Sequence, residues 1–164
     1  MEIIVEKIIN FLSLSTPKEI IVFLISMFPI LELRGSILAA GILKMDFLST
    51  FIIAIIGNML PIPFILLFID KIFRLLKRTK LESFVTKLEN KALSKSEQIT
   101  KYGKFGLLLF VAIPLPGTGA WTGSLIAALL KMKFKDSILA ISIGIVIAGL
   151  IMSLISFGII KPII

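Results

Sequence analysis

Glu32 and Arg34 are the residues of this sequence whose types and surroundings could most directly carry chemistry. They lie in residues 29–36, Pro-Ile-Leu-Glu-Leu-Arg-Gly-Ser, directly after a long apolar run. Charged side chains inside apolar segments of this kind are rare, and they mark transport pathways, proton relays or paired structural ions. A guanidinium can hold a phosphate in a bidentate fork, and a desolvated carboxylate can carry a proton. A salt bridge that only holds the chain in place is the alternative role of this pair.

A second polar group lies in residues 114–124, Pro-Leu-Pro-Gly-Thr-Gly-Ala-Trp-Thr-Gly-Ser. Its hydroxyls, its glycine-flanked backbone N–H groups and the indole N–H of Trp121 could bind a polar headgroup. Turn formation and helix capping are the simpler roles of the hydroxyls, and packing or anchoring at a fixed depth is the simpler role of Trp121. The candidate substrate-binding residues of both segments are Glu32, Arg34, Gly35, Ser36, Pro116, Gly117, Thr118, Gly119, Trp121, Thr122 and Ser124.

The composition is that of an integral membrane protein. Of the 164 residues, 57% are hydrophobic and 17% are charged, against about 45–50% and about 25% in soluble domains. The net charge is +8, and in so apolar a chain a basic excess orients loops and meets anionic lipid rather than nucleic acid. Cys and His are absent, which excludes thiol and imidazole catalysis. Without a metal-ligand cluster or a P-loop, we expect no metal, no cofactor and no enzymatic activity.

Two apolar segments are too short to cross a bilayer. A helix over residues 20–31 would be about 18 Å long, against a hydrocarbon core of about 30 Å, and the run at 105–115 is shorter still. Prolines and glycines then interrupt the helix in both places. The runs at 47–69 and 137–160 are long enough to cross, although Pro61 and Pro63 should kink the first.

The sequence also contains an internal repeat. Residues 35–40, Gly-Ser-Ile-Leu-Ala-Ala, match residues 123–128, Gly-Ser-Leu-Ile-Ala-Ala. After a slip of one residue, both copies continue with a Lys-Met pair and a Phe three positions after the lysine, at 44–47 and 131–134. Gly57 then corresponds to Gly144 within the following spans. Chance recurrence of Ala, Leu and Ile in an apolar chain is the alternative explanation.

We therefore expect an all-α fold with one membrane domain over residues 1–164, built from two copies of a re-entrant helical hairpin followed by a transmembrane helix. Repeat 1 covers 18–69 (hairpin 18–45, span 47–69), and repeat 2 covers 105–160 (hairpin 105–131, span 137–160). Residues 1–15 should form an interfacial helix that is retained, because the features of a cleaved signal peptide are lacking.

Residues 70–104 contain ten Lys or Arg and four Asp or Glu, so we expect amphipathic surface helices on the cytoplasmic side, with a solvated basic loop as the alternative. Basic residues at 131–135 flank the other end of the second hairpin. This hairpin should therefore enter from the cytoplasm and return to it. The first span must end at the cytoplasmic segment 70–104, so the first hairpin should enter from outside, and the two repeats are inverted. Broken backbone in lipid must be buried or line a cavity, so the two breaks, predicted at 32–35 and 116–123, are expected to meet near the middle of the membrane.

The segments 32–36 and 113–123 resemble the family of small multidrug export proteins, and the likeness runs from about Ser26 to Gly158. That family is similar, more distantly, to DedA and VTT-domain membrane proteins, which have two facing re-entrant helices and are associated with moving lipids, including polyprenyl phosphates, between leaflets. The resemblance implies a DedA-like fold in which Glu32 takes the place of a re-entrant acid. The second DedA motif carries arginines, which residues 116–123 lack, although Arg34 could compensate from the other repeat.

The expected function is that of a multi-pass transporter of the cell membrane. Its leading form is a flippase or scramblase that carries an anionic lipid, a polyprenyl phosphate or a phospholipid, past a polar site between the hairpins, with proton or ion coupling left open. The alternatives are efflux of small cationic drugs, which Glu32 would attract and Arg34 repel, and a non-transporting membrane scaffold. Membrane lipids are the expected partners, and assembly into a homo-oligomer is open.

Overall fold

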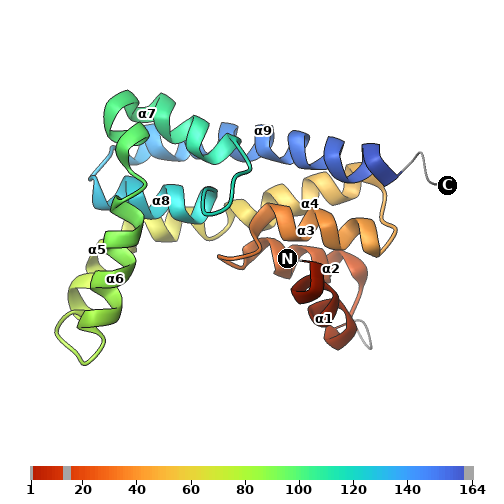
Figure 1. Cartoon of the computed structure of the whole chain (residues 1–164), viewed down its shortest axis with the longest axis horizontal. Helices are drawn as coiled ribbons and strands as arrows, with labels where there is room; N and C mark the ends of the chain where they lie inside the picture. Colours follow the sequence, from red (N-terminus) through yellow and green to blue (C-terminus); the bar gives the residue numbers. More distant parts are fainter. Residues whose placement is uncertain (1, 13–15, 161–164) are drawn as a thin grey trace. The chain divides into compact units, whose positions relative to one another are not determined.

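The computed structural model describes residues 2–12 and 16–160, which form an all-helical fold without strands (Figure 1). The helices of this part of the chain are α1 (Glu2–Leu12), α2 (Lys18–Met27), α3 (Glu32–Ile42), α4 (Phe47–Met59), α5 (Ile62–Leu76), α6 (Glu82–Leu93), α7 (Glu97–Ala112), α8 (Ala120–Leu129) and α9 (Phe134–Ile160). The predicted all-α class is confirmed. The described residues group into two compact units, one within Met1–Leu60 and Ile145–Ile164, the other Pro61–Gly144.

In the first unit, α2, α3 and α4 pack side by side (Figure 1). The buried residues of α2 fall on one helical face because they recur at intervals of about four; they are Ile21, Val22, Ile25 and Ser26. Helix α1 adds Val5 and Ile9 to the same apolar cluster, while Ile3 and Ile4 remain exposed. The N-terminal helix expected at 1–15 is therefore present over its described part, and one face of it packs into the unit.

In the second unit, α8 lies at the centre, because α5, α6 and α7 all contact it. Helix α7 is not continuous: Gly103 has φ 56° and ψ −130°, which divides the helix into two segments. Beyond that corner Gly106 lies against the backbone of Gln98 and Ile99, where a Cβ atom would clash with the Gln98 carbonyl oxygen. The apolar segment before the second break is thus only residues 104–112.

The two breaks lie earlier than predicted. The chain leaves the helix at 28–31 and 113–119, whereas the sequence predicted the breaks at 32–35 and 116–123. Glu32 and Arg34 lie in the first turn of α3, and Trp121 and Thr122 in the first turn of α8. The reason is that proline ends the preceding helix, but the proline-free residues that follow have adequate helix propensity and start a new one at once.

Two stretches are long and apolar enough to cross a membrane, Phe47–Leu76 with a mean hydropathy of 2.5 and Phe134–Ser156 with 2.8. Only 28% of the most apolar part of the first stretch and 39% of that of the second are buried, so each leaves a mostly exposed apolar surface that lipid would cover in a membrane. The helix is interrupted at Leu60 and Pro61, as the prolines predicted. Helix α5 continues beyond residue 69, the predicted end of the span, to Leu76, because Ile72, Phe73 and Leu76 maintain an apolar face through the first charged residues. The end of the span itself stays a prediction.

Candidate substrate sites at the two helix breaks

The first break ends at Glu32, in a strained backbone conformation. The Glu32 N–H donates to the Phe28 carbonyl at 2.8 Å, and the Gly35 N–H donates to the Leu31 carbonyl at 2.8 Å. Glu32 has a φ of 47°, a left-handed conformation that costs a residue with a Cβ atom roughly 1–2 kcal/mol. Strain of this kind concentrates at functional sites, where the surrounding structure holds it.

Among the described residues, Glu32 is the charged residue that is buried, with 7% of its surface exposed. Arg34 is half-buried, and the Glu32 carboxylate acts electrostatically on its guanidinium. The first turn of a helix favours a negative charge and disfavours a positive one, because the free N–H groups there carry partial positive charge. The carboxylate therefore compensates both the helix end and Arg34, so the two side chains must be treated as one electrostatic pair.

Thr118 shapes the second break. Its hydroxyl lies 2.8 Å from the Ile113 carbonyl oxygen and 2.9 Å from that of Leu115, and it accepts a hydrogen bond from the Leu115 N–H at 3.2 Å. Gly117 and Gly119 have φ values of 81° and 131°, conformations that favour glycine. The turn-forming role of these residues, the simpler one expected from the sequence, is thus visible in the loop.

Lys95 contacts the second break, and the sequence did not predict this contact. Its ammonium group donates a hydrogen bond of 2.9 Å to the Gly117 carbonyl, from the connection between α6 and α7. This places a positive charge at a loop whose own sequence has none. No pattern in the sequence signals the contact, because it depends on α6 folding back onto α8.

Ser36 and Ser124 hold equivalent places in the two copies. The Ser36 hydroxyl donates to the Leu33 carbonyl and the Ser124 hydroxyl to the Trp121 carbonyl, each at 2.9 Å. Both serines are fully buried. Their hydrogen bonds run back along their own helices, which satisfies the hydroxyls without a ligand.

Gly35 and Gly123 allow close packing of the hairpin helices. A Cβ atom on Gly35 would lie 2.7 Å from Leu31 Cβ and 3.4 Å from Ile25 on α2. A Cβ atom on Gly123 would lie 2.8 Å from Val111 on α7. The matched Gly-Ser pairs therefore lie where α3 approaches α2 and where α8 approaches α7.

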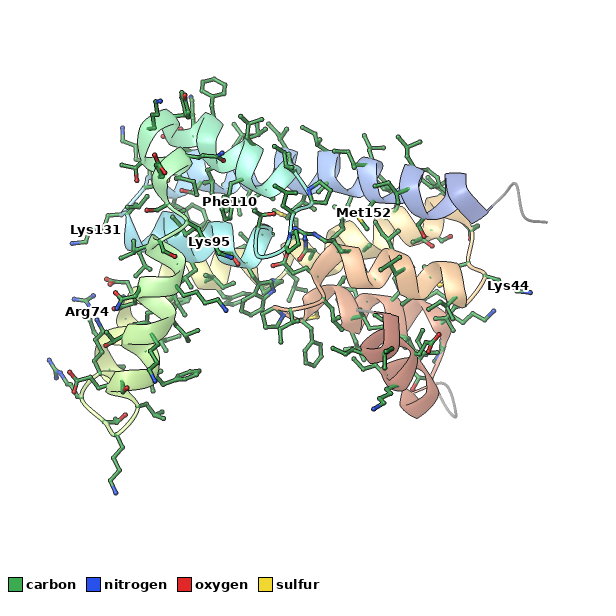
Figure 2. The ribbon with its side chains drawn as sticks, in the orientation of Figure 1. Lys44, Arg74, Lys95, Phe110, Lys131 and Met152 are labelled. Atoms are coloured by element: carbon green, nitrogen blue, oxygen red, sulfur yellow. The ribbon has the colours of Figure 1, made fainter. Side chains whose placement is uncertain are left out.

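The two copies also end in the same cap. Lys44 and Lys131 have φ values of 51° and 54°, and Met45 and Met132 donate to the carbonyls five residues before them, at 3.0 and 2.9 Å. This is the Schellman arrangement, in which a residue in the left-handed region ends the helix. Figure 2 shows both lysine side chains pointing away from their helices. The repeat thus has a structural counterpart in each copy, while its inverted and re-entrant arrangement stays a prediction.

The remaining candidates complete the two groups. Pro116 is exposed in the second loop, and Trp121 and Thr122 are half-buried on α8. The structure thus gathers Glu32, Arg34, Gly35 and Ser36 at the start of α3, and the other seven candidates in the second loop and the start of α8. That the two groups form one site stays a prediction.

These features define an all-helical membrane protein with two helix-break-helix segments and two apolar helices of spanning length. The profile of the family described as "Putative small multi-drug export protein" matches residues 32–151, and the chain belongs to this family. The match begins at Glu32 and includes the whole second break. No curated protein and no solved structure matches the chain significantly. The likeness to DedA proteins stays a prediction.

Proposed function

We propose that this protein exports small cationic, amphiphilic molecules across the membrane, with Glu32 as the residue that attracts them. The observation that carries the proposal is the burial of Glu32, with 7% of the residue exposed, at the strained first position of α3. A carboxylate in such surroundings attracts a lipophilic cation and can exchange it for a proton. The description of the family as one of small multidrug export proteins supports export of small molecules, and it favours this alternative over the lipid specificity expected from the sequence.

Carriage of an anionic lipid is the second candidate, because a cation lies at each break. Arg34 is half-buried beside the first, and Lys95 donates to Gly117 in the second. A guanidinium could hold a headgroup phosphate in a bidentate fork, and an ammonium could bind it as a point charge.

Purified protein in liposomes with an imposed pH gradient tests the proposal. The measurement compares movement of a fluorescent cationic dye with leaflet exchange of a labelled phospholipid and a polyprenyl phosphate. Glu32→Gln should lower dye transport roughly 10- to 100-fold, since interactions with a charged group contribute about 1.5–3 kcal/mol. Glu19→Gln, which removes an exposed carboxylate from the first turn of α2, is the matched control. If the protein exchanges lipid between leaflets and Glu32→Gln leaves the dye flux unchanged, the second candidate is favoured. Wild-type protein that moves neither the dye nor either lipid would contradict both candidates.

A further inference from the structure

A groove of about 320 Å³ lies along the C-terminal end of α5. It is lined by Lys71, Arg74, Leu75 and Arg78, which recur at the spacing of one helical face. All four side chains are exposed. Figure 2 shows Arg74 at the outer edge of the hairpin formed by α5 and α6.

The groove keeps an excess of positive charge. Asp70 forms an ion pair with Arg74, with 3.1 Å between Oδ2 and Nη2. The other ion pair near this end of α5 joins Lys77 to Glu89 of α6, so that carboxylate is already engaged by a lysine that does not line the groove. Three cations and one carboxylate leave about two positive charges in a small space, an arrangement that attracts an anion.

The same face of α5 becomes apolar one turn earlier. At about 100° per residue, Phe64, Leu67 and Phe68 project in the direction of the groove. They are exposed by 61%, 51% and 45%. These three residues lie within the candidate span Phe47–Leu76, Lys71 and Arg74 lie in its last six residues, and Arg78 lies just past its end. One helix face thus changes from apolar to basic where a membrane would change from acyl chains to headgroups.

We propose that this face of α5 binds an anionic glycerophospholipid of the surrounding membrane. Its phosphate would lie among Lys71, Arg74 and Arg78, and an acyl chain would cover Phe64 and Phe68. A soluble acidic partner would complement the three cations but leave the apolar half of the face uncovered. The lipid complements both halves, and this site is separate from the two breaks and independent of the transported substrate.

Lipid binding by the full-length protein tests this inference. Native mass spectrometry would count phosphatidylglycerol and phosphatidylcholine retained after release from nanodiscs that contain both. The triple variant Lys71→Gln, Arg74→Gln, Arg78→Gln should lose phosphatidylglycerol affinity by roughly tenfold or more. The control Lys87→Gln, Lys91→Gln, Lys101→Gln removes the same charge from exposed positions on α6 and α7, and it should change that affinity less than about twofold.

Three results would overturn the inference. Equal losses of phosphatidylglycerol affinity in both triple variants would indicate a diffuse basic surface, and equal binding of both lipids by the wild type would show no preference for the anionic one. Full competition of inorganic phosphate with phosphatidylglycerol would indicate a site for a free anion. Circular dichroism checks that each variant is folded. If the groove variant is not, the single change Arg78→Gln, at an exposed residue past the end of α5, replaces it, with Lys87→Gln as its control. Phe64→Ala with Phe68→Ala should then weaken binding of long-chain but not of dihexanoyl phosphatidylglycerol.

Discussion

The ammonium group of Lys95 donates a hydrogen bond of 2.9 Å to the carbonyl of Gly117. The two residues are 22 positions apart, and the bond ties the connection between α6 and α7 to the loop before α8. Gly117 has a φ of 81°, and a Cβ atom there would clash with the Lys95 ammonium. Lys95 therefore fills the space that the glycine leaves and fixes the second break from outside its own hairpin.

Replacing Lys95 by Met should loosen this loop. One hydrogen bond contributes about 0.5–1.5 kcal/mol net, so amide hydrogen exchange at residues 117–119 should accelerate by roughly two- to tenfold. Hydrogen exchange with mass spectrometry measures this directly. Lys91→Met, at an exposed position on α6, should leave the exchange of the loop unchanged. Equal rates in wild type and Lys95→Met would mean that the bond does not hold the loop.

Gly57 is predicted to be intolerant of any side chain. A Cβ atom there would clash with the Ser26 hydroxyl and lie 2.9 Å from the Phe23 carbonyl oxygen. Gly57→Ala should therefore destabilise the protein by about 1–3 kcal/mol in a denaturation assay in detergent, as overpacking does. Gly158→Ala is the control, because a Cβ atom there meets nothing within 4 Å. Adding Ser26→Ala to Gly57→Ala should recover part of the loss, and no recovery would place the conflict elsewhere.

Asp46 should give the start of α4 a pH-dependent stability. The Ser49 backbone N–H donates to the Asp46 carboxylate at 2.8 Å, and this bond is the main cause that lowers the pKa of Asp46 below its ordinary value. A carboxyl group whose pKa is lower in the folded state than in the unfolded chain stabilises the fold at pH values above its unfolded-state pKa. This stabilisation is lost as the pH falls through the folded-state pKa. Asp46→Asn should abolish this acidic dependence while keeping the cap, whereas Asp46→Ala should lower stability at neutral pH as well. Parallel pH profiles for wild type and Asp46→Asn would contradict the assignment.

Lys87 and Lys133 test the predicted topology. If residues 70–104 and 131–135 both lie in the cytoplasm, single cysteines at these two exposed positions should share the same accessibility. The chain contains no natural cysteine, so labelling with an impermeant thiol reagent in whole cells and in inverted vesicles reports each site alone. Labelling of one cysteine from outside and of the other only from inside would rule out a re-entrant second hairpin.

The repeat shows what the sequence could predict. A Cβ atom on Gly57 would meet Phe23 and Ser26 of α2, and one on Gly144 would meet Leu108 and Val111 of α7, so the matched glycines allow matched close approaches between helices. Such features are readable because proline, glycine and the Lys-Met pair act on the backbone within a few residues of themselves. The existence of both breaks followed from the same local rules.

Features that depend on long-range packing were not readable. The contact of Lys95 with Gly117 requires α6 to return to α8, and the left-handed conformation of Glu32 requires neighbours that hold it against its steric cost. The start of α3 was misplaced because a glycine at position 35 predicted a break. In the structure that glycine lies inside the helix, where it admits the side chains of Leu31 and Ile25.

Glu32 and Arg34 offer the sharpest test, because function and structure predict opposite stabilities. Glycine should relieve the strain at Glu32, which has a φ of 47°, because the left-handed conformation costs a residue with a Cβ atom about 1–2 kcal/mol. The greater freedom of glycine in the unfolded chain offsets about 0.4–1 kcal/mol of this gain. If the carboxylate serves transport, Glu32→Gly and Glu32→Gln should both lose dye export, and Glu32→Gly should be at least as stable as the wild type.

If the carboxylate only neutralises Arg34, both variants should fail to accumulate, since an uncompensated charge within the membrane costs about 2.5–3.5 kcal/mol on insertion scales. The exchanged pair Glu32→Arg with Arg34→Glu would then restore accumulation, and dye export would remain at the wild-type level in every variant that accumulates. Membrane abundance and transport measured on the same vesicles distinguish the two outcomes, and the second would remove Glu32 from the proposed site.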